Sequence, residues 1–177
     1  MNAFFTADHH FGHANIIKYS KRPFSSLDEM DETMLSRWNE IIKPNDIVYH
    51  LGDLSFFNLN NQSRVLLERL NGVIFYIRGN HDKFNSKIPR FEWVRDFAEI
   101  KIGGQKITLC HYAMRVWNCS HHGAWHLYGH SHGSLPDDPN SLSFDVGVDC
   151  WDFYPVSFEQ VAERMKQKTF KPVDHHR

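Results

Sequence analysis

The sequence predicts an α/β fold in which two mixed β-sheets pack together and helices cover their outer faces. Two observations support this fold class. The first half of the chain alternates short apolar runs with stretches of helical periodicity, as β-α-β units do, and the second half is rich in predicted strands. A length of 177 residues is normal for one compact domain. The chain has no repeat and no dividing linker, so we expect one domain over 1–177 with a polar tail at 170–177.

The first half contains three predicted strands and two predicted helices. Their bounds are 3–6, 46–50 and 73–77 for the strands, and 26–42 and 61–70 for the helices. The longer helix has apolar residues at helical spacing, acids in its first turns and Pro44 just beyond its end. The shorter helix is expected to end at Asn71-Gly72, because glycine readily adopts the left-handed conformation that ends many helices.

The second half begins with a predicted hairpin and ends with a predicted helix. Strands are expected at 97–102, 105–110, 125–128 and 142–146. Gly103-Gly104 joins the first two, because a glycine pair permits the positive φ angles of a tight turn. The last helix covers 157–168, with Ser157 as its N-cap and apolar residues on one side.

Composition excludes several classes of protein. The chain is 41% hydrophobic and has a formal net charge of -1, so it is neither disordered nor a general electrostatic coat for nucleic acid. No apolar run approaches the roughly 20 residues that a membrane-spanning helix needs, and the N-terminus lacks the basic region of a signal peptide. We therefore expect a cytoplasmic protein without a membrane partner. Three scattered cysteines form no C-x-x-C pair, which argues against a disulfide framework and a zinc knuckle.

Potential metal ligands follow five of the predicted strands. They are Asp8 and His10, Asp53, Asn80, His111, and His130 with His132. Because α/β sheets bind ligands at the carboxyl ends of their strands, these side chains are expected to meet in one cleft. Glycines at 52, 79 and 129 stand directly before three of the groups, where a sharp turn and close approach are needed. Asp8 with His10, and His130 with His132, have the i, i+2 spacing that points two side chains the same way in an extended segment.

The donor set exceeds what one ordinary zinc site uses. Two carboxylates, one amide oxygen and four imidazoles suit two divalent cations that share a carboxylate. Mixed oxygen and nitrogen donors favour Mn, with Fe, Zn, Co or Ni as alternatives, over Ca or Mg. Two cations about 3.5–4 Å apart can hold a bridging hydroxide and support in-line displacement at phosphorus. A pair of cations on these donors would therefore be suited to hydrolysis at phosphorus.

The ordered motifs resemble the calcineurin-like metallophosphoesterase superfamily, in its short bacterial and phage-type branch. The resemblance rests on Asp8-His9-His10, Gly52-Asp53, Gly79-Asn80-His81-Asp82, His111 and Gly129-His130-Ser131-His132, which occur in family order over about three quarters of the chain. The segment Asp145-Val146-Gly147-Val148-Asp149 adds to it. The resemblance implies a four-layer α/β/β/α sandwich and hydrolysis of phosphate monoesters or diesters.

The resemblance also implies a role for each motif residue. One cation is expected on Asp8, His10, Asp53 and His132, and the other on Asp53, Asn80, His111 and His130, with Asp53 shared. His81 is expected to lie near the phosphate and to donate a proton or a hydrogen bond to the leaving oxygen. Asp82 is expected to orient His81 or its loop.

Two arginines are candidates for binding the phosphate, because guanidinium matches its geometry. They are Arg22, next to Pro23, and Arg78, next to Gly79; an ordinary salt bridge is the alternative reading of each. The substrate is expected to be a phosphate ester, with nucleotides and nucleic acids as candidates. The sequence leaves monoester or diester preference, the natural substrate and the oligomeric state open.

Three further functions compete with a phosphoesterase of small substrates. A nuclease would use the same metal pair on DNA or RNA. A non-catalytic scaffold would keep the fold, but it would tolerate loss of Asp53, Asn80 or His81, and all three are present. An iron oxygenase needs only two histidines and one carboxylate, which the seven donors exceed.

Overall fold

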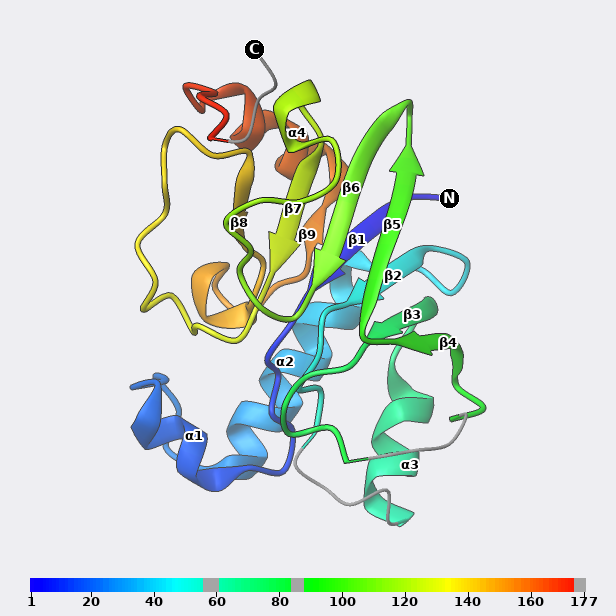
Figure 1. Ribbon diagram of the computed structural model, residues 1–177. Helices are drawn as coiled ribbons and strands as arrows, with labels where there is room; N and C mark the ends of the chain where they lie inside the picture. The colour runs from blue at the N-terminus through cyan, green and yellow to red at the C-terminus, as the bar shows by residue number, and fades with distance from the viewer. Residues whose placement is uncertain (56–60, 84–87, 174–177) are drawn as a thin grey trace.

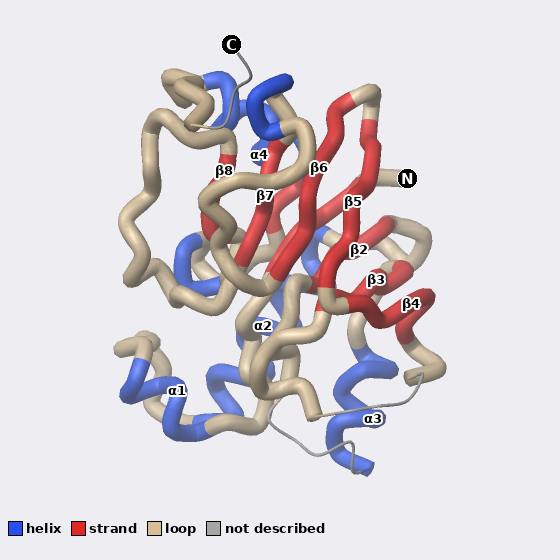
Figure 2. The backbone as a smooth tube through the Cα atoms, in the orientation of Figure 1, coloured by secondary structure: helices blue, strands red, loops and turns tan. Residues whose placement is uncertain are grey.

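Two mixed β-sheets face each other in this protein (Figures 1 and 2). The structure is a computed structural model, and it describes residues 1–55, 61–83 and 88–173. The first sheet has the strand order β4 (Phe91–Arg95), β3 (Val73–Ile77), β2 (Ile47–His50), β1 (Ala3–Thr6) and β9 (Val156–Ser157). The second has the order β5 (Phe97–Ile102), β6 (Gln105–Cys110), β7 (Trp125–Tyr128) and β8 (Ser143–Asp145). The predicted α/β class with two mixed sheets and flanking helices is confirmed.

Strands β1 to β4 run parallel, and the short β9 pairs with β1 in the opposite direction. In register, Phe4 lies beside Val48, and Val48 lies beside Ile74. These three side chains are buried on the face that the helices cover. The alternation of side chains along each strand places Phe5 and Ile77 on the opposite face, toward the second sheet.

Helices α2 (Leu27–Ile41) and α3 (Asn61–Arg69) cover the outer face of the first sheet (Figure 1). Helix α1 (Ala14–Tyr19) contributes Ile16 to the same core. In α2 the buried residues Met30, Met34 and Trp38 recur every four positions, which forms one apolar stripe. Ser26 caps this helix by accepting a hydrogen bond from the Glu29 N–H at 3.2 Å. The predicted helix is therefore present, within one residue of its expected bounds.

The second sheet begins with the predicted hairpin. Strands β5 and β6 pair antiparallel from Phe97 with Cys110 to Ile102 with Gln105, and Gly103 and Gly104 have φ angles of +55° and +89°. Strands β6, β7 and β8 then run parallel. Both sheets therefore bring the carboxyl ends of parallel strands to the same region of the molecule.

The core between the sheets also receives the last helix, α4 (Phe158–Lys166), through Val161 and Met165. Ser157 caps it in a capping box with Gln160, as predicted for the cap. The outer side of β7 is covered instead by the segment 113–124, in which Trp117 lies 5.3 Å from the ring of His126. Layers of helix therefore flank the first sheet more fully than the second.

Among the strands of the described residues, β4 and β9 were not predicted. Of the expected tail, residues 170–173 are described, whereas His175 and His176 lie outside the described residues. Among the described helices, none combines the length and the apolar character that crossing a membrane requires.

Candidate metal centre

Loops that leave five strands converge at one edge of the two sheets. The loops after β1 and β2 lie side by side, because the N–H groups of Asp8 and His10 donate to the carbonyls of Gly52 and Asp53, each at 3.0 Å. The loops after β6 and β7 are joined in the same way by Gly129 N–H and His111 O at 3.0 Å. An open cleft of about 540 Å³ lies over these loops and is lined in part by Asp53, Asn80, His81, His130 and His132.

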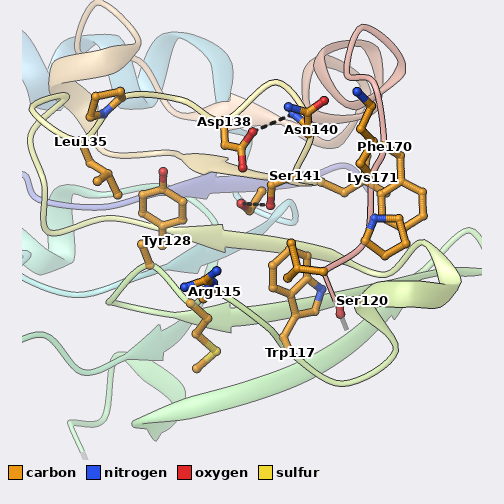
Figure 3. A pocket seen from close by; sticks show the side chains of 17 residues that line it. Arg115, Trp117, Ser120, Tyr128, Leu135, Asp138, Asn140, Ser141, Phe170 and Lys171 are labelled. Atoms are coloured by element: carbon orange, nitrogen blue, oxygen red, sulfur yellow. Dashed lines mark hydrogen bonds between the residues drawn. The ribbon is translucent and has the colours of Figure 1, made fainter. Parts of the chain in front are cut away.

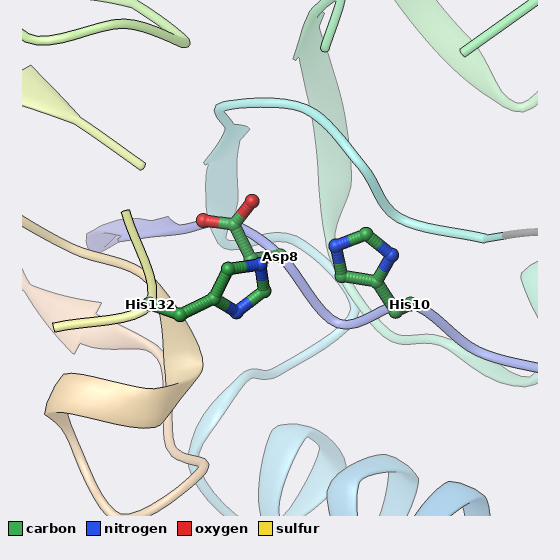
Figure 4. Close-up of side chains that lie close together, drawn as sticks. All are labelled: Asp8, His10 and His132. Atoms are coloured by element: carbon green, nitrogen blue, oxygen red, sulfur yellow. The ribbon is translucent and has the colours of Figure 1, made fainter. Parts of the chain in front are cut away.

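Four of the seven predicted ligands line this cleft, namely Asp53, Asn80, His130 and His132, whereas Asp8, His10 and His111 are buried close to them. Donor atoms of Asp8, His10 and His132 lie within 4.8 Å of one another (Figure 4), and so do those of Asp8, Asp53 and His111. Asn80 Oδ1 lies 3.0 Å from His111 Nε2. The ring of His130 lies 5.1 Å from that of His111. Asp8 belongs to both groups, a position that the resemblance does not assign to it.

Asp53 lies between His10 and His111. Its Oδ2 atom is 3.7 Å from His10 Nε2 and 3.5 Å from His111 Nε2. Its Oδ1 atom accepts a hydrogen bond of 2.9 Å from the backbone N–H of His81. One carboxylate therefore faces an imidazole of each expected cation site, as a shared ligand must.

The backbone at this centre is unusual. Of the nine non-glycine residues with positive φ in the described ranges, five are predicted ligands: Asp8, His10, Asp53, His130 and His132. Positive φ is uncommon for residues with a side chain, and such conformations concentrate at functional sites where the surrounding structure enforces them. More than half of these conformations therefore occur at predicted ligands.

Two glycines leave room for the carboxylates. A Cβ atom on Gly79 would overlap Oδ1 of Asp53, and a Cβ atom on Gly129 would lie 2.5 Å from Oδ2 of Asp8. Glycine is required here by close approach, because any side chain would displace a carboxylate.

Burial shapes the electrostatics of the donors. Burial, then the nearby Asp145 and Asp53 carboxylates, raises the pKa of Asp8 well above its ordinary value. Burial, assisted by the neighbouring His132, lowers the pKa of His10 to about 2, so its imidazole is neutral and can act as a ligand. Within the described part of the chain, Asp8 Oδ1 and both ring nitrogens of His10 are buried without a hydrogen-bond partner.

These observations fit divalent cations. A cation would supply the partner that the buried Asp8 and His10 atoms lack, and it would offset the repulsion between neighbouring carboxylates. His111 is oriented for the same purpose, because its Nδ1–H donates to the Leu51 carbonyl at 2.7 Å and directs Nε2 toward Asp53.

His81 lies at the cleft, as expected for a residue near the phosphate, and its ring lies 5.3 Å from that of His10. Asp82 is buried, and its Oδ2 accepts from Gly79 N–H at 2.7 Å, Asp53 N–H at 2.9 Å and the Tyr76 hydroxyl at 2.7 Å. Of the two roles expected for Asp82, these contacts fit that of holding the loop.

The expectation that Arg22 contacts substrate is wrong. Its side chain is fully buried and forms an ion pair of 2.8 Å with Asp149, and it also donates to the carbonyls of Asp8 at 2.6 Å and His9 at 2.8 Å. A guanidinium with these partners is not available to a phosphate. Arg78 is partly exposed and pairs with Asp96 at 2.6 Å, so its role in substrate binding stays a prediction.

Sequence reasoning missed Asp149, which contacts His132 Nδ1 at 2.7 Å. Burial favours its neutral acid, but the hydrogen bonds from His132 and Arg22 outweigh burial and hold the pKa of Asp149 below its ordinary value. Asp149 ends the segment Asp145–Asp149, which contributed to the resemblance without carrying a role. That segment was the sequence feature from which a role for Asp149 could have been predicted.

A second cavity of about 390 Å³ lies on the outer side of the second sheet (Figure 3). Arg115, Trp117, Tyr128 and Phe170 are among the residues that line it. None of the seven predicted ligands lines this cavity, so it is separate from the metal centre.

Comparison with known proteins points to one family. The model of the calcineurin-like phosphoesterase superfamily domain matches residues 1–147. Uncharacterized protein MJ1445 of Methanocaldococcus jannaschii is 38% identical over 167 residues, which cover 91% of this chain and 89% of that protein. Gene 66 protein of Mycobacterium phage D29 is 27% identical over 186 residues, covering 88% and 92%. The crystal structure of AQ665 from Aquifex aeolicus, described as a protein of unknown function, has the same fold, with a TM-score of 0.71, 22% identity and coverage of 92% and 98%.

Proposed function

Because the chain belongs to the calcineurin-like phosphoesterase superfamily, we propose that it hydrolyses phosphate monoesters or diesters with two divalent cations, Mn first among them. The observation that carries this proposal is the position of Asp53, whose Oδ2 lies 3.7 Å from His10 Nε2 and 3.5 Å from His111 Nε2. A carboxylate between two imidazoles at a strained strand exit is suited to a pair of cations.

The ligands divide into two sets that share Asp53. Asp8, His10 and His132 would complete the first, and Asn80, His111 and His130 would complete the second. When bound, the cations would supply Lewis acidity toward the phosphate and lower the pKa of the attacking water. The protein contributes the fixed orientation of these donors, because Leu51 O and Asp149 orient the rings of His111 and His132.

His81 is the residue we propose for the leaving oxygen. Its backbone N–H is bonded to Asp53 Oδ1 at 2.9 Å, which ties its position to the shared ligand. Its side chain is exposed at the cleft, where it can hold a proton at a ring nitrogen and deliver it to the departing alkoxide or aryloxide. Asp82 acts as a positioning residue, since it holds the N–H groups of Gly79 and Asp53.

A nuclease or nucleotide hydrolase is the second candidate, and two exposed aromatic residues favour it. Tyr19 lines the cleft and is 72% exposed, and Tyr112 is 48% exposed with its ring 4.8 Å from that of His130. Aromatic rings beside a phosphate site are suited to stack on nucleobases. Lys21 also lines the cleft and adds positive charge for a polyanion. The non-catalytic scaffold is less well supported, because all seven predicted donors are present in the sequence.

The test is hydrolysis of bis-p-nitrophenyl phosphate and p-nitrophenyl phosphate by the Mn-loaded protein, followed by mononucleotides and single-stranded oligonucleotides. We expect cleavage of at least one reporter, and loss of that cleavage in Asp53→Asn. Asp152→Asn is the matched control, because its carboxylate is exposed and pairs with Arg37. If the metal-loaded wild type cleaves none of these compounds, the scaffold function is favoured.

Two further variants test whether the substrate is a nucleotide or a nucleic acid. Tyr19→Ala and Tyr112→Ala should raise KM for oligonucleotides by about 10-fold, since loss of one base stack costs about 1–3 kcal/mol. Their KM for a simple alkyl phosphate ester should not change. Equal effects on both substrates would argue against base stacking.

A further inference from the structure

A buried ion pair beside the metal centre links three segments that are distant in the sequence. Arg22 follows α1, Asp149 lies in the 3-10 turn Val148–Cys150 after β8, and His132 follows β7. Arg22 Nε and one terminal nitrogen each donate to a different oxygen of Asp149 at 2.8 Å. Arg22 and Asp149 side chains are 0% and 7% exposed, so water competes little for this pair.

The pair acts on His132 through one hydrogen bond. Asp149 Oδ2 lies 2.7 Å from His132 Nδ1 and already accepts from Arg22. A carboxylate held by a guanidinium offers only acceptors, so the imidazole must carry its hydrogen on Nδ1. The lone pair of His132 is then on Nε2, the other nitrogen of the ring.

The guanidinium of Arg22 also binds the loop that carries Asp8 and His10. It donates to the carbonyl of Asp8 at 2.6 Å and to that of His9 at 2.8 Å. Asp8 and His10 have φ angles of +60° and +54°, conformations that need support from their surroundings. Arg22 therefore supports the backbone of the loop that carries the ligands Asp8 and His10.

We propose that Arg22 and Asp149 are positioning residues for one half of the metal centre, which fix the Nδ1–H tautomer of His132 and the strained Asp8–His10 loop together. The proposal rests on the proposed metal site, and its test separates the two. Neither residue touches the substrate. Their effect should be largest at the cation that Asp8, His10 and His132 would share, because the pair contacts His132 and the Asp8 backbone directly.

Asp149→Asn is the sharpest variant. An amide has one acceptor oxygen, and Arg22 requires an acceptor, so the oxygen of the new amide would face Arg22 and its NH2 group would face His132. The NH2 group donates, which moves the ring hydrogen to Nε2, the wrong tautomer for binding a cation. Arg22→Lys keeps the charge but loses the paired donors, so it should have a smaller effect in the same direction.

The first measurement uses the metal-free protein. Long-range 1H–15N NMR spectra assigned to His132 should show the Nδ1–H tautomer in the wild type and the Nε2–H tautomer in Asp149→Asn. An Nε2–H ring in the wild type would overturn the proposal, whatever the protein does with metals or substrates. This readout also remains valid if the proposed hydrolase activity is absent.

The second measurement is titration with Mn alone, followed by EPR. Asp149→Asn should bind one of its two equivalents about 10- to 100-fold more weakly, the usual effect of losing a partner that orients a ligand. Its affinity for the other equivalent should fall clearly less. Arg37→Gln is the matched control, because Arg37 also pairs with an aspartate, Asp152, at 3.2 Å but makes no contact with the predicted ligands. Equal binding by Asp149→Asn and Arg37→Gln would overturn the proposal. If the wild type binds no Mn, the proposed function fails, and the tautomer alone decides the role of the pair.

Discussion

Asp53 and His81 are joined by a hydrogen bond of 2.9 Å, in which the backbone N–H of His81 donates to Oδ1 of Asp53. The bond uses only the main chain of His81. A side chain proposed for the leaving group is therefore anchored to the carboxylate proposed to bind both cations. This separation of backbone and side chain allows the two roles to be tested independently.

His81→Ala should lower turnover without emptying the metal site. Loss of a proton donor typically costs about 10²- to 10⁴-fold in rate, whereas the backbone N–H that supports Asp53 is kept. The measurement is kcat on both p-nitrophenyl esters together with Mn content by elemental analysis. A fall in Mn content equal to that of Asp53→Asn would show that His81 serves metal binding instead.

Gly79→Ala should disrupt the centre through sterics alone. The new methyl group would overlap Oδ1 of Asp53, so the carboxylate or the loop must move. We expect loss of Mn binding and a lower midpoint of thermal unfolding. Gly103→Ala is the control: its Cβ would meet nothing within 4 Å, and its φ of +55° predicts a cost of only about 1–2 kcal/mol with Mn binding intact. If Gly79→Ala binds Mn as the wild type does, the close packing at Asp53 is not required.

His126 should make the protein less stable in mild acid. Burial lowers the pKa of His126 to about 4, while hydrogen bonds to carbonyl groups partly oppose that effect. Below the ordinary value near 6.5, the unfolded chain takes up a proton that the folded protein excludes, so stability falls as the pH decreases from about 6.5 toward 4. At pH 5 this amounts to about 2 kcal/mol.

The measurement for His126 is urea unfolding at pH 7.5 and pH 5.0. The wild type should lose about 2 kcal/mol more on acidification than His126→Gln, which removes this titrating group. Comparing each protein with itself cancels the intrinsic cost of the substitution. Identical losses would mean that His126 is protonated in the folded protein.

Mn should stabilise the protein more at neutral pH than in acid. Burial and neighbouring carboxylates raise the pKa of Asp8, so protons compete with cations for it as the pH decreases. A cation at 100 times its Kd adds about 2.7 kcal/mol to the free energy of unfolding. The midpoint of thermal unfolding with Mn and with excess chelator should differ clearly at pH 8 and much less at pH 5.5. An Mn effect that grows on acidification would contradict this account of Asp8.

Local patterns were sufficient to predict most of the fold. The hairpin of β5 and β6 was predicted because Gly103-Gly104 fixes its turn, and α2 because Met30, Met34 and Trp38 share one face. The missed elements depend on distant partners instead. Strand β9 has two residues and exists through pairing of Val156 with Phe5 on β1. Short segments of this kind have no periodicity to detect.

The candidate ligands were predicted by the same local logic, since each follows a strand. The residues that hold them in place were not, because their partners lie far along the chain. Asp149 and Arg22 are 127 positions apart, and nothing in the flanking residues indicates that they meet. Arg22 beside Pro23 has the appearance of a phosphate-binding loop residue, and only its burial shows otherwise.

The most direct test of the account is a crystal structure of the Mn-soaked protein with anomalous scattering recorded at the manganese edge. We predict two anomalous peaks in the cleft, one beside Asp8, His10 and His132 and one beside Asn80, His111 and His130, with Asp53 in contact with both. A single peak, or two peaks of which one is out of reach of Asp53, would contradict the shared-carboxylate centre.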